Sequence, residues 1–186
     1  MKPYTPAEDT LLLIDALKKL DKVDRAAEIG CSIGYSTSAV LEKAGEVLAT
    51  DIDFQALQMA RDRLSGDYGR LHLLQGDGLN FVRDGRHFTL VVCNPPYLPD
   101  TGLGDPTIEG GPTGVETSIS ILKQASALLA TSGGILLIGS SLGDLNLLRS
   151  EAKKLGLSVI ELAKVKLFFE DLICFLFRPN YSTAFP

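Results

Sequence analysis

The chain has 186 residues, of which 45% are hydrophobic and 22% charged, so it can form one well-packed domain but is too short for two ordinary ones. The net charge of −5 argues against a general electrostatic affinity for nucleic acid, which needs a basic surface. No charged leader precedes an apolar run, and Glu170 and Asp171 interrupt the late apolar segment 166–177, so we expect a cytoplasmic protein with no membrane span.

Strand and helix patterns alternate through the first half of the chain. We expect an N-terminal helix over residues 5–20 with a Thr or Asp as its cap, because one apolar face is formed by Leu12, Leu13, Ala16, Leu17 and Leu20. The pattern then predicts a strand at 24–30, a helix at 35–45 closed by Gly45, a strand at 46–53, a helix at 54–64, and strands at 70–77 and 88–94.

A loop from Pro95 to about Gly114 follows, rich in Gly, Pro and Asp and too long for a mere connection, so we expect it to be functional. Beyond it the pattern predicts a helix at 116–134 stopped by glycines, a strand at 135–141, a helix at 144–156, two strands within 157–177, and a loosely held tail at 178–186. This alternation predicts an α/β fold with a largely parallel sheet and a single domain spanning 1–186.

The cysteines are odd in number and widely separated. Cys31, Cys93 and Cys174 form no C-x-x-C pair, and the chain has only two histidines. We therefore expect buried free thiols, with neither a disulfide framework nor a metal site.

A glycine-containing turn, "AAEIGCSIGYST", joins the first strand to the next helix. Its Gly30 and Gly34 are spaced G-x-x-x-G, unlike the G-x-G-x-x-G of a pyrophosphate-binding turn, and the preceding Glu28 would repel a phosphate. An acidic pocket of this kind suits a ligand with a positive charge or several hydroxyls. Taken alone, the stretch is equally compatible with an ordinary tight turn.

Two more acids follow the next two strands. Asp51 lies about 20 residues beyond the glycine turn, where an acid can accept hydrogen bonds from both ribose hydroxyls, and Asp77, beside Gly78, is placed to accept from an adenine amino group. Each acid alone is more simply a helix cap or a solvated loop residue. Together with Glu28 they line the edge where open α/β sheets bind ligands. The set resembles the S-adenosylmethionine pocket of Rossmann-like class I methyltransferases.

The fourth strand ends in Asn94-Pro95-Pro96-Tyr97. The two prolines fix their own φ angles and Pro95 biases Asn94 away from helical geometry, so the Asn94 amide has little freedom to lose on binding. The Asn94 oxygen and a proline carbonyl can each accept one N–H of a planar NH2 group, while Tyr97 walls in the conjugated group. Such acceptors also stabilise positive charge that develops on nitrogen during methyl transfer. Nucleobase amines and the glutamine carboxamide both carry this kind of nitrogen.

The Asn94–Tyr97 motif resembles that of amino methyltransferases acting on adenine and of HemK/PrmC-type glutamine methyltransferases of release factors. The opening Tyr4-Thr5-Pro6-Ala7-Glu8-Asp9-Thr10-Leu11-Leu12-Leu13 is more discriminating, and is similar to the start of the eukaryotic and archaeal HemK branch, which lacks the bacterial N-terminal domain. The resemblance implies a seven-stranded, mostly parallel sheet with helices on both faces. It also implies methylation of the Gly-Gly-Gln glutamine of a class-I release factor.

The resemblance implies a role for individual residues as well. The N-terminal helix, within residues 1–20, would lie over the cofactor pocket, and Asn94, Pro95 and Tyr97 would be catalytic. Contacts with S-adenosylmethionine would come from Thr10, Glu28, Gly30, Gly34, Asp51, Asp77, Gly78 and Asn94. A small zinc-binding activator subunit would join an exposed sheet edge, which we place at the apolar strand around Leu71–Leu74; a helix or a second copy of the chain are the alternatives.

The sequence differs from the family pattern at two places, and two other functions are compatible with it. Ser32 replaces a glycine common in the cofactor turn, which we expect to matter little because serine is small, and Glu116 ends a loop from Pro99 that we expect to shape the substrate entrance. An adenine-amino methyltransferase on DNA or RNA is the alternative function, although it would need a basic surface. A cofactor-binding scaffold without catalysis is a third possibility, against which Asn94 and Tyr97 argue.

Overall fold

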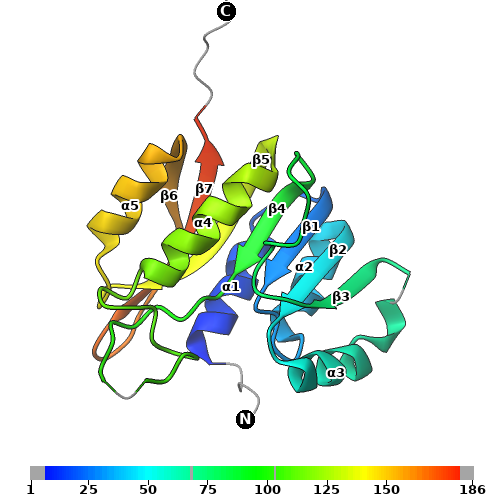
Figure 1. Cartoon of the computed structure of the whole chain (residues 1–186), viewed down its shortest axis with the longest axis horizontal. Helices are drawn as coiled ribbons and strands as arrows, with labels where there is room; N and C mark the ends of the chain where they lie inside the picture. Colours follow the sequence, from blue (N-terminus) through cyan, green and yellow to red (C-terminus); the bar gives the residue numbers. More distant parts are fainter. Residues whose placement is uncertain (1–6, 68, 103, 181–186) are drawn as a thin grey trace, which may run out of the picture.

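The structure is a computed structural model that describes residues 7–67, 69–102 and 104–180 (Figure 1). Its elements, in chain order, are α1 Glu8–Lys18, β1 Val23–Ile29, α2 Tyr35–Lys43, β2 Ala44–Asp51, α3 Phe54–Arg63, a short 3-10 helix Ser65–Asp67, β3 Leu71–Gln75, β4 Phe88–Cys93, α4 Glu116–Leu128, β5 Leu129–Ser140, α5 Leu145–Lys154, β6 Leu157–Lys166 and β7 Asp171–Pro179.

The seven strands form one sheet in the order β3-β2-β1-β4-β5-β7-β6. Strands β1 to β5 pair in parallel, and β7 is antiparallel to both β5 and β6. The predicted pair of strands within 157–177 is therefore confirmed as the β6–β7 hairpin, and β3 lies at one end of the sheet as expected. Because β6 then runs in the same direction as β5, the strands other than β7 all end at one edge of the sheet.

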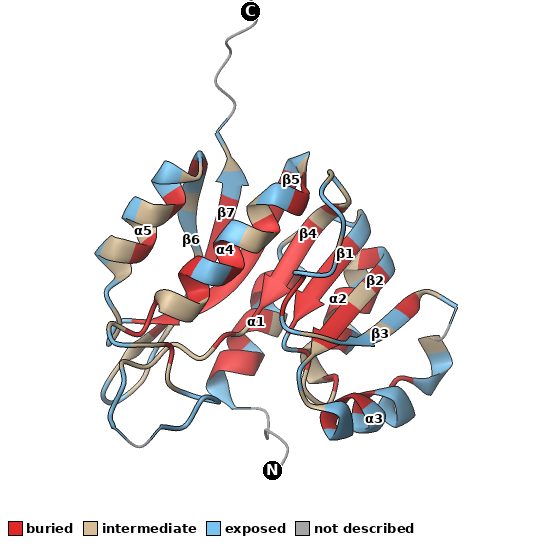
Figure 2. Ribbon diagram, viewed as in Figure 1, coloured by how far each residue is buried: buried red, intermediate tan, exposed pale blue. Residues whose placement is uncertain are grey.

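Helices cover both faces of the sheet, which confirms the predicted α/β fold (Figure 1). Leu13 of α1 and Val40 of α2 pack in one apolar cluster, whereas Leu122 of α4 and Leu148 of α5 pack in a second cluster on the opposite face. The central strands are buried from both sides, and the terminal strands β3 and β6 are more exposed (Figure 2). The resulting layers fix the edge at which the strands end.

Helix α1 forms because its apolar positions recur at helical spacing and meet the sheet. Leu12, Leu13, Ala16 and Leu17 are buried. The predicted Thr or Asp cap is wrong, since Ala7 occupies the cap position without a side-chain hydrogen bond. The helix instead gains its stability from its buried face, as short helices in proteins usually do. Thr5 lies outside the described residues.

Two helix ends and the tail differ from the sequence prediction. Gly45 lies within β2, and Gly133 and Gly134 lie within β5, so none of these glycines ends a helix. Helices α2 and α4 pass directly into extended backbone, because the parallel pairs Val23↔Ala44 and Phe88↔Leu129 begin at once. Strand β7 also extends through Pro179, so the predicted tail starts too early; residues 181–186 lie outside the described part.

The thiols of Cys31, Cys93 and Cys174 are free and buried, as predicted. Burial raises the pKa of each of them, which keeps them protonated at neutral pH. Within the described ranges, no helix is long and apolar enough to cross a membrane, and no three ligating side chains gather as a metal site would need.

Candidate active site

The ends of β1, β2 and β4 lie side by side at one edge of the sheet. Ile29 pairs with both Thr50 and Cys93, so the residues that follow these strands come out at the same level. The Gly30 N–H donates to the Thr50 carbonyl at 2.8 Å, which fixes the start of the glycine turn against β2. The register thus brings the turn, Asp51 and Asn94 together, as the sequence predicted.

Glu28 is the most deeply buried acid of this edge, with only 2% of its surface exposed. Its Oε2 atom is buried without a hydrogen-bond partner among the described residues. Burial raises the pKa of Glu28 to about 7, the Ser36 and Thr37 hydroxyls offset part of that rise, and the charge of Asp51 adds to it. A cation placed against Oε2 would restore the charged form and supply the missing partner.

The two glycines of the turn are each required for a different structural reason. Gly30 has a φ of 72°, and no atom of the described residues lies within 4 Å of the position its Cβ would take, so this part of the structure leaves the backbone open to a ligand. Gly34 has a φ of 81° at the cap of α2, and its Cβ would lie 2.8 Å from Cδ1 of Leu64. Gly30 therefore opens the site, whereas Gly34 lets α2 pack against the end of α3.

Ser32 has a φ of 48°, in the left-handed region that favours glycine. This φ adds a backbone cost at Ser32 that the size of its side chain does not reveal, and the expectation that the serine matters little to the cofactor turn stays a prediction. Asp51 holds the turn in this conformation: its Oδ2 atom accepts from the Ser32 N–H at 2.7 Å and its Oδ1 atom from the Asp53 N–H at 2.9 Å. A carboxylate has about four acceptor positions, so Asp51 keeps two for donors other than these backbone N–H groups.

Asp77 and Gly78 follow β3 and lie further out. Asp77 is exposed, while Gly78 is buried with a φ of 61°. A Cβ on Gly78 would overlap the Gln124 side chain of α4, whose Oε1 atom accepts from the Leu79 N–H at 2.8 Å. Gly78 thus allows α4 to fasten this turn, and Asp77 is the outermost of the three acids.

Asn94, after β4, is held from the first turn of α1. Its Nδ2 atom donates to Oδ2 of Asp9 at 2.9 Å, and the Tyr97 hydroxyl donates to the same oxygen at 3.2 Å. The Oδ1 atom of Asn94 is buried and has no hydrogen-bond partner among the described residues. Thr10, the predicted cofactor contact beside Asp9, is 4% exposed and its N–H donates to Oδ1 of Asp9 at 2.6 Å.

Asp9 is the site residue that sequence reasoning missed. It is 6% exposed although it is ionisable, and it joins α1 to a motif 85 residues away. A signal was present in the sequence: Asp9 precedes Leu13 by four residues and Ala16 by seven, so it lies on the buried face of the helix. An acid on such a face needs a polar partner in the interior.

The loop after Asn94 is organised by its glycines and by Glu116. Gly110 N–H donates to the Leu98 carbonyl at 2.8 Å, so the loop folds back on itself. Glu116 accepts from the Thr113 and Val115 N–H groups; although desolvation raises its pKa, these bonds and the Thr113 hydroxyl lower it overall. Glu116 therefore shapes the loop, and the contribution to the substrate entrance that the sequence suggested stays a prediction.

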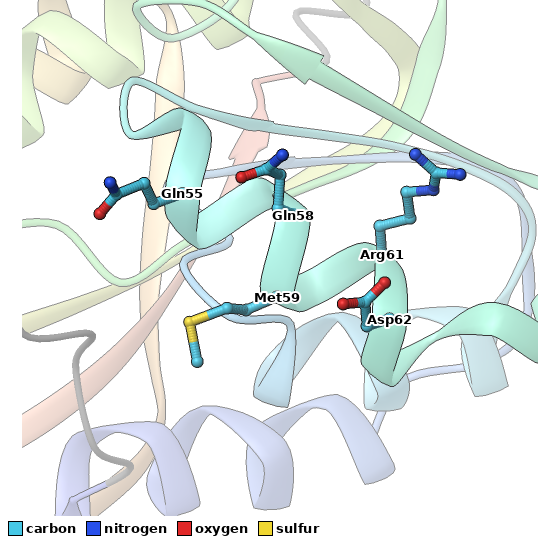
Figure 3. A pocket seen from close by; sticks show the side chains of 5 residues that line it. All are labelled: Gln55, Gln58, Met59, Arg61 and Asp62. Atoms are coloured by element: carbon cyan, nitrogen blue, oxygen red, sulfur yellow. The ribbon is translucent and has the colours of Figure 1, made fainter.

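One surface depression lies away from this edge. It is lined by side chains of the single helix α3, which project outward around Gln58 and Met59 (Figure 3). No strand end, glycine turn or buried acid contributes to it. The candidate active site is accordingly the strand-end edge with Glu28, Asp51 and Asn94.

Comparison with known proteins shows which family this chain belongs to. The sequence profile of the methyltransferase small domain family matches residues 7–155. The chain is 28% identical to the eRF1 methyltransferase catalytic subunit of Schizosaccharomyces pombe, covering 91% of this chain and 86% of that protein. It is 29% identical to the release factor glutamine methyltransferase of Deinococcus radiodurans, covering 70% of this chain and 51% of that protein.

Among solved structures, the E. cuniculi Mtq2–Trm112 complex, responsible for methylation of the eRF1 termination factor, matches with a TM-score of 0.78 and 26% identity, covering 97% of this chain and all of that chain. These relatives confirm the resemblance to HemK-type glutamine methyltransferases and the class I methyltransferase fold. The chain is a methyltransferase that belongs to the methyltransferase small domain family.

Proposed function

We propose that this protein transfers a methyl group from S-adenosylmethionine to a protein glutamine amide, in particular the Gly-Gly-Gln glutamine of a class-I translation release factor. The observation that carries the proposal is the Oδ1 atom of Asn94, a buried acceptor without a partner at the edge where Glu28 and Asp51 lie. The relatives described above, which act on release factors, support the choice of substrate.

The residues of the turn fit the cofactor. Glu28 offers a buried, unpartnered carboxylate oxygen for its cationic part, and Asp51 offers its remaining acceptor positions to the ribose hydroxyls. Gly30 leaves the backbone open, and Asp77 would accept from the adenine amino group. Thr10, Gly34 and Gly78 complete the set of proposed cofactor contacts, with Asn94 at its boundary. When bound, the cofactor supplies an electrophilic methyl group on a sulfonium.

The segment Asn94–Tyr97 after β4, which we call the corner, would hold the substrate. Asn94 Oδ1 and the carbonyl of Pro95, to which no backbone N–H of the described part donates, would accept the two N–H groups of the carboxamide. Tyr97 would form a wall of the pocket. As the amide nitrogen bonds to the methyl group, the methyl–sulfur bond would break and leave its electron pair on sulfur, giving a neutral thioether. The nitrogen would gain positive charge, which both acceptors would stabilise until one of its protons is lost to solvent.

We propose that the activator subunit binds at β3, the end strand of the sheet. Leu71 is buried and Leu73 half-buried, but 45% of Leu74 is exposed on the edge strand. A hollow beside it is lined by Leu74, Leu48, Val82 and Phe88 together with charged residues of β1 and β2. The S. pombe relative is a catalytic subunit and the E. cuniculi relative is seen in a complex, which supports a partner; we propose that it is a small zinc-binding protein in the cytoplasm.

The proposed function is tested by offering the enzyme several substrates with labelled S-adenosylmethionine. The substrates are a class-I release factor, its Gln→Ala variant in the Gly-Gly-Gln motif, and unmodified DNA and RNA. We expect label on the release factor alone and none on its Gln→Ala variant. Label on nucleic acid but not on protein would assign the Asn94 corner to an adenine amine instead.

The partner proposal is tested in the same assay with and without the zinc-binding subunit. We expect Leu74→Asp to weaken binding of the subunit, because it places a charge on the β3 edge. Ile160→Asp is the matched control, since Ile160 is 56% exposed on β6 at the opposite end of the sheet. Equal loss of binding in both variants, or in neither, would overturn the placement at β3.

A further inference from the structure

The orientation of the Asn94 side chain is determined by Asp9. A carboxylate accepts hydrogen bonds and donates none, so only the amino end of the Asn94 amide can face it. The Nδ2–Oδ2 distance of 2.9 Å and the second donor, the Tyr97 hydroxyl at 3.2 Å, both point to a carboxylate oxygen that accepts. The amide oxygen of Asn94 is consequently turned the other way.

The two ends of an asparagine amide have almost the same shape, so packing alone chooses poorly between them. If the amide were reversed, an NH2 group would take the place of the buried Oδ1 atom, and a carboxylate and a carbonyl oxygen would oppose each other at Asp9. A reversed Asn94 would then present a donor to the N–H groups of a carboxamide. Methyl transfer to such a nitrogen needs an acceptor at this position.

We propose that Asp9 is a positioning residue that also determines specificity: by holding Nδ2 of Asn94 it keeps Oδ1 available as an acceptor, so that the site takes a carboxamide and rejects the corresponding carboxylate. This inference rests on the proposed function and adds a residue to it. A glutamate side chain of the same size offers no N–H to Oδ1, and a buried acceptor left without its donor costs binding.

The alternative is that Asp9 only ties α1 to the loop after β4. Such a structural role would lower stability and cofactor affinity together with activity. The positioning role instead predicts a selective effect on the reaction, because Asp9 acts through the amide of Asn94. The two roles therefore differ in what else changes when Asp9 is replaced.

Two variants of Asp9 and one control separate these roles. Asp9→Asn keeps the size of the side chain, but its NH2 must oppose either Nδ2 of Asn94 or the Thr10 N–H, both of which now donate to the carboxylate. Asp9→Ala removes both acceptors. Asp15→Asn is the matched control, the same change in the same helix at an exposed position.

The first readout requires no substrate. In 15N-labelled protein, the Nδ2 protons of Asn94 should exchange slowly with solvent in the wild type and the Asp15→Asn control, and faster in Asp9→Asn and Asp9→Ala. Equal exchange in all four proteins would overturn the proposed hydrogen bond, whether or not the protein methylates a release factor.

The second readout is catalysis on the release factor and on its Gln→Glu variant, together with cofactor binding by calorimetry. We expect Asp9→Asn to lower kcat roughly ten- to a hundredfold, the cost of one misplaced hydrogen-bonding group, with cofactor affinity close to wild type. The opposed donors should also lower the melting temperature, so cofactor affinity is the readout that separates the two roles. An unchanged kcat, or a parallel loss of cofactor affinity and stability in both Asp9 variants, would overturn the positioning role.

A double-mutant cycle completes the test. Binding of the release factor to each variant loaded with S-adenosylhomocysteine can be measured even where transfer is lost. If Asp9 acts through Asn94, Asp9→Ala should weaken binding in the wild-type background and add little in Asn94→Ala. Additive losses would contradict the proposal. A wild type that methylates no release factor would instead refute the proposed function, while the exchange readout would still decide on Asp9.

Discussion

The turn after β1 and the corner after β4 use their acids in opposite ways. In the turn, each carboxylate oxygen of Asp51 accepts one hydrogen bond from a backbone N–H group. The more deeply buried Glu28 has one oxygen without a hydrogen-bond partner among the described residues. In the corner, Asp9 accepts from Asn94 and Tyr97, and the open acceptor is the neutral oxygen of Asn94.

This difference matches the two ligands proposed for the site. An unpartnered carboxylate is suited to a cation, because burial opposes its charge until a positive group arrives. A neutral amide oxygen is suited to an N–H group that must remain uncharged until it reacts. The turn therefore contains a carboxylate without a counter-charge, and the corner contains an acceptor without a donor. We expect variants of the turn to lose cofactor affinity and variants of the corner to lose kcat.

The largest effect should come from Asn94→Ala, which removes the acceptor of the corner and leaves the turn intact. We expect kcat to fall about a hundred- to a thousandfold, in the range seen when one group that stabilises a transition state is lost. Cofactor affinity by calorimetry should remain close to that of the wild type. A large loss of cofactor affinity would mean that the division between turn and corner is wrong.

Glu28→Gln should affect the turn alone, and it should change how the free energy of unfolding depends on pH. Since burial raises the pKa of Glu28 from 4.5 to about 7, its contribution to stability is complete below pH 4.5 and is lost as pH rises through 7. That loss amounts to about 3 kcal/mol for a shift of this size, and Gln should not show it.

Thermal unfolding of the ligand-free proteins across this pH range checks the prediction. We expect Glu28→Gln to be the more stable protein on the alkaline side, with the difference shrinking as pH falls, and to bind S-adenosylmethionine more weakly. Glu42→Gln, an exposed acid of α2, is the control and should follow the wild type. Parallel curves for Glu28→Gln and the wild type would show that Glu28 is not held protonated by burial.

Gly34→Ala should lower the free energy of unfolding by roughly 1–3 kcal/mol, because it adds left-handed strain to a contact with Leu64. Urea unfolding measures the effect. Gly66→Ala, on the neighbouring 3-10 helix, serves as the comparison and should change stability little, because no described residue lies within 4 Å of the position its Cβ would take. Similar losses in the two variants would mean that packing at α2 does not require Gly34.

The smallest effect should come from Ser32→Gly, which relieves the positive φ of the turn and should raise stability by no more than about 1 kcal/mol. Ser120→Gly provides the opposite expectation, since Ser120 lies in the middle of α4 and replacing serine by glycine there should destabilise by about 0.5 kcal/mol. If Ser32→Gly unfolds more easily than the wild type, the serine side chain stabilises the protein by more than the positive φ destabilises it.

The turn was easier to predict from sequence than the corner, for a physical reason. Glu28 and Asp51 stand at the ends of short apolar strands, and parallel strands bring such ends together whatever the details of packing. Asp9 and Asn94 meet only after α1 packs on the finished sheet, so no local pattern joins them. The φ of Ser32 was also out of reach, because it depends on the hydrogen bond that Asp51 makes across the turn.

Helix ends show the same limit at the level of the fold. Gly45 and Gly133 looked like helix stops, but pairing with β1 and β4 extends β2 and β5 through both glycines. Local conformational preference yields here to tertiary pairing, which the sequence of one segment does not contain.

The most direct test of the account is the chemical position of the transferred methyl group. A release factor labelled by the wild-type enzyme is digested, and its Gly-Gly-Gln peptide is hydrolysed in acid. We predict that the label is released as methylamine, which requires a methyl group on the glutamine nitrogen, and that it is absent when Asn94→Ala replaces the wild type. Label recovered as methanol from a carboxyl ester, or unchanged labelling by Asn94→Ala, would contradict a site built to accept the N–H groups of an amide.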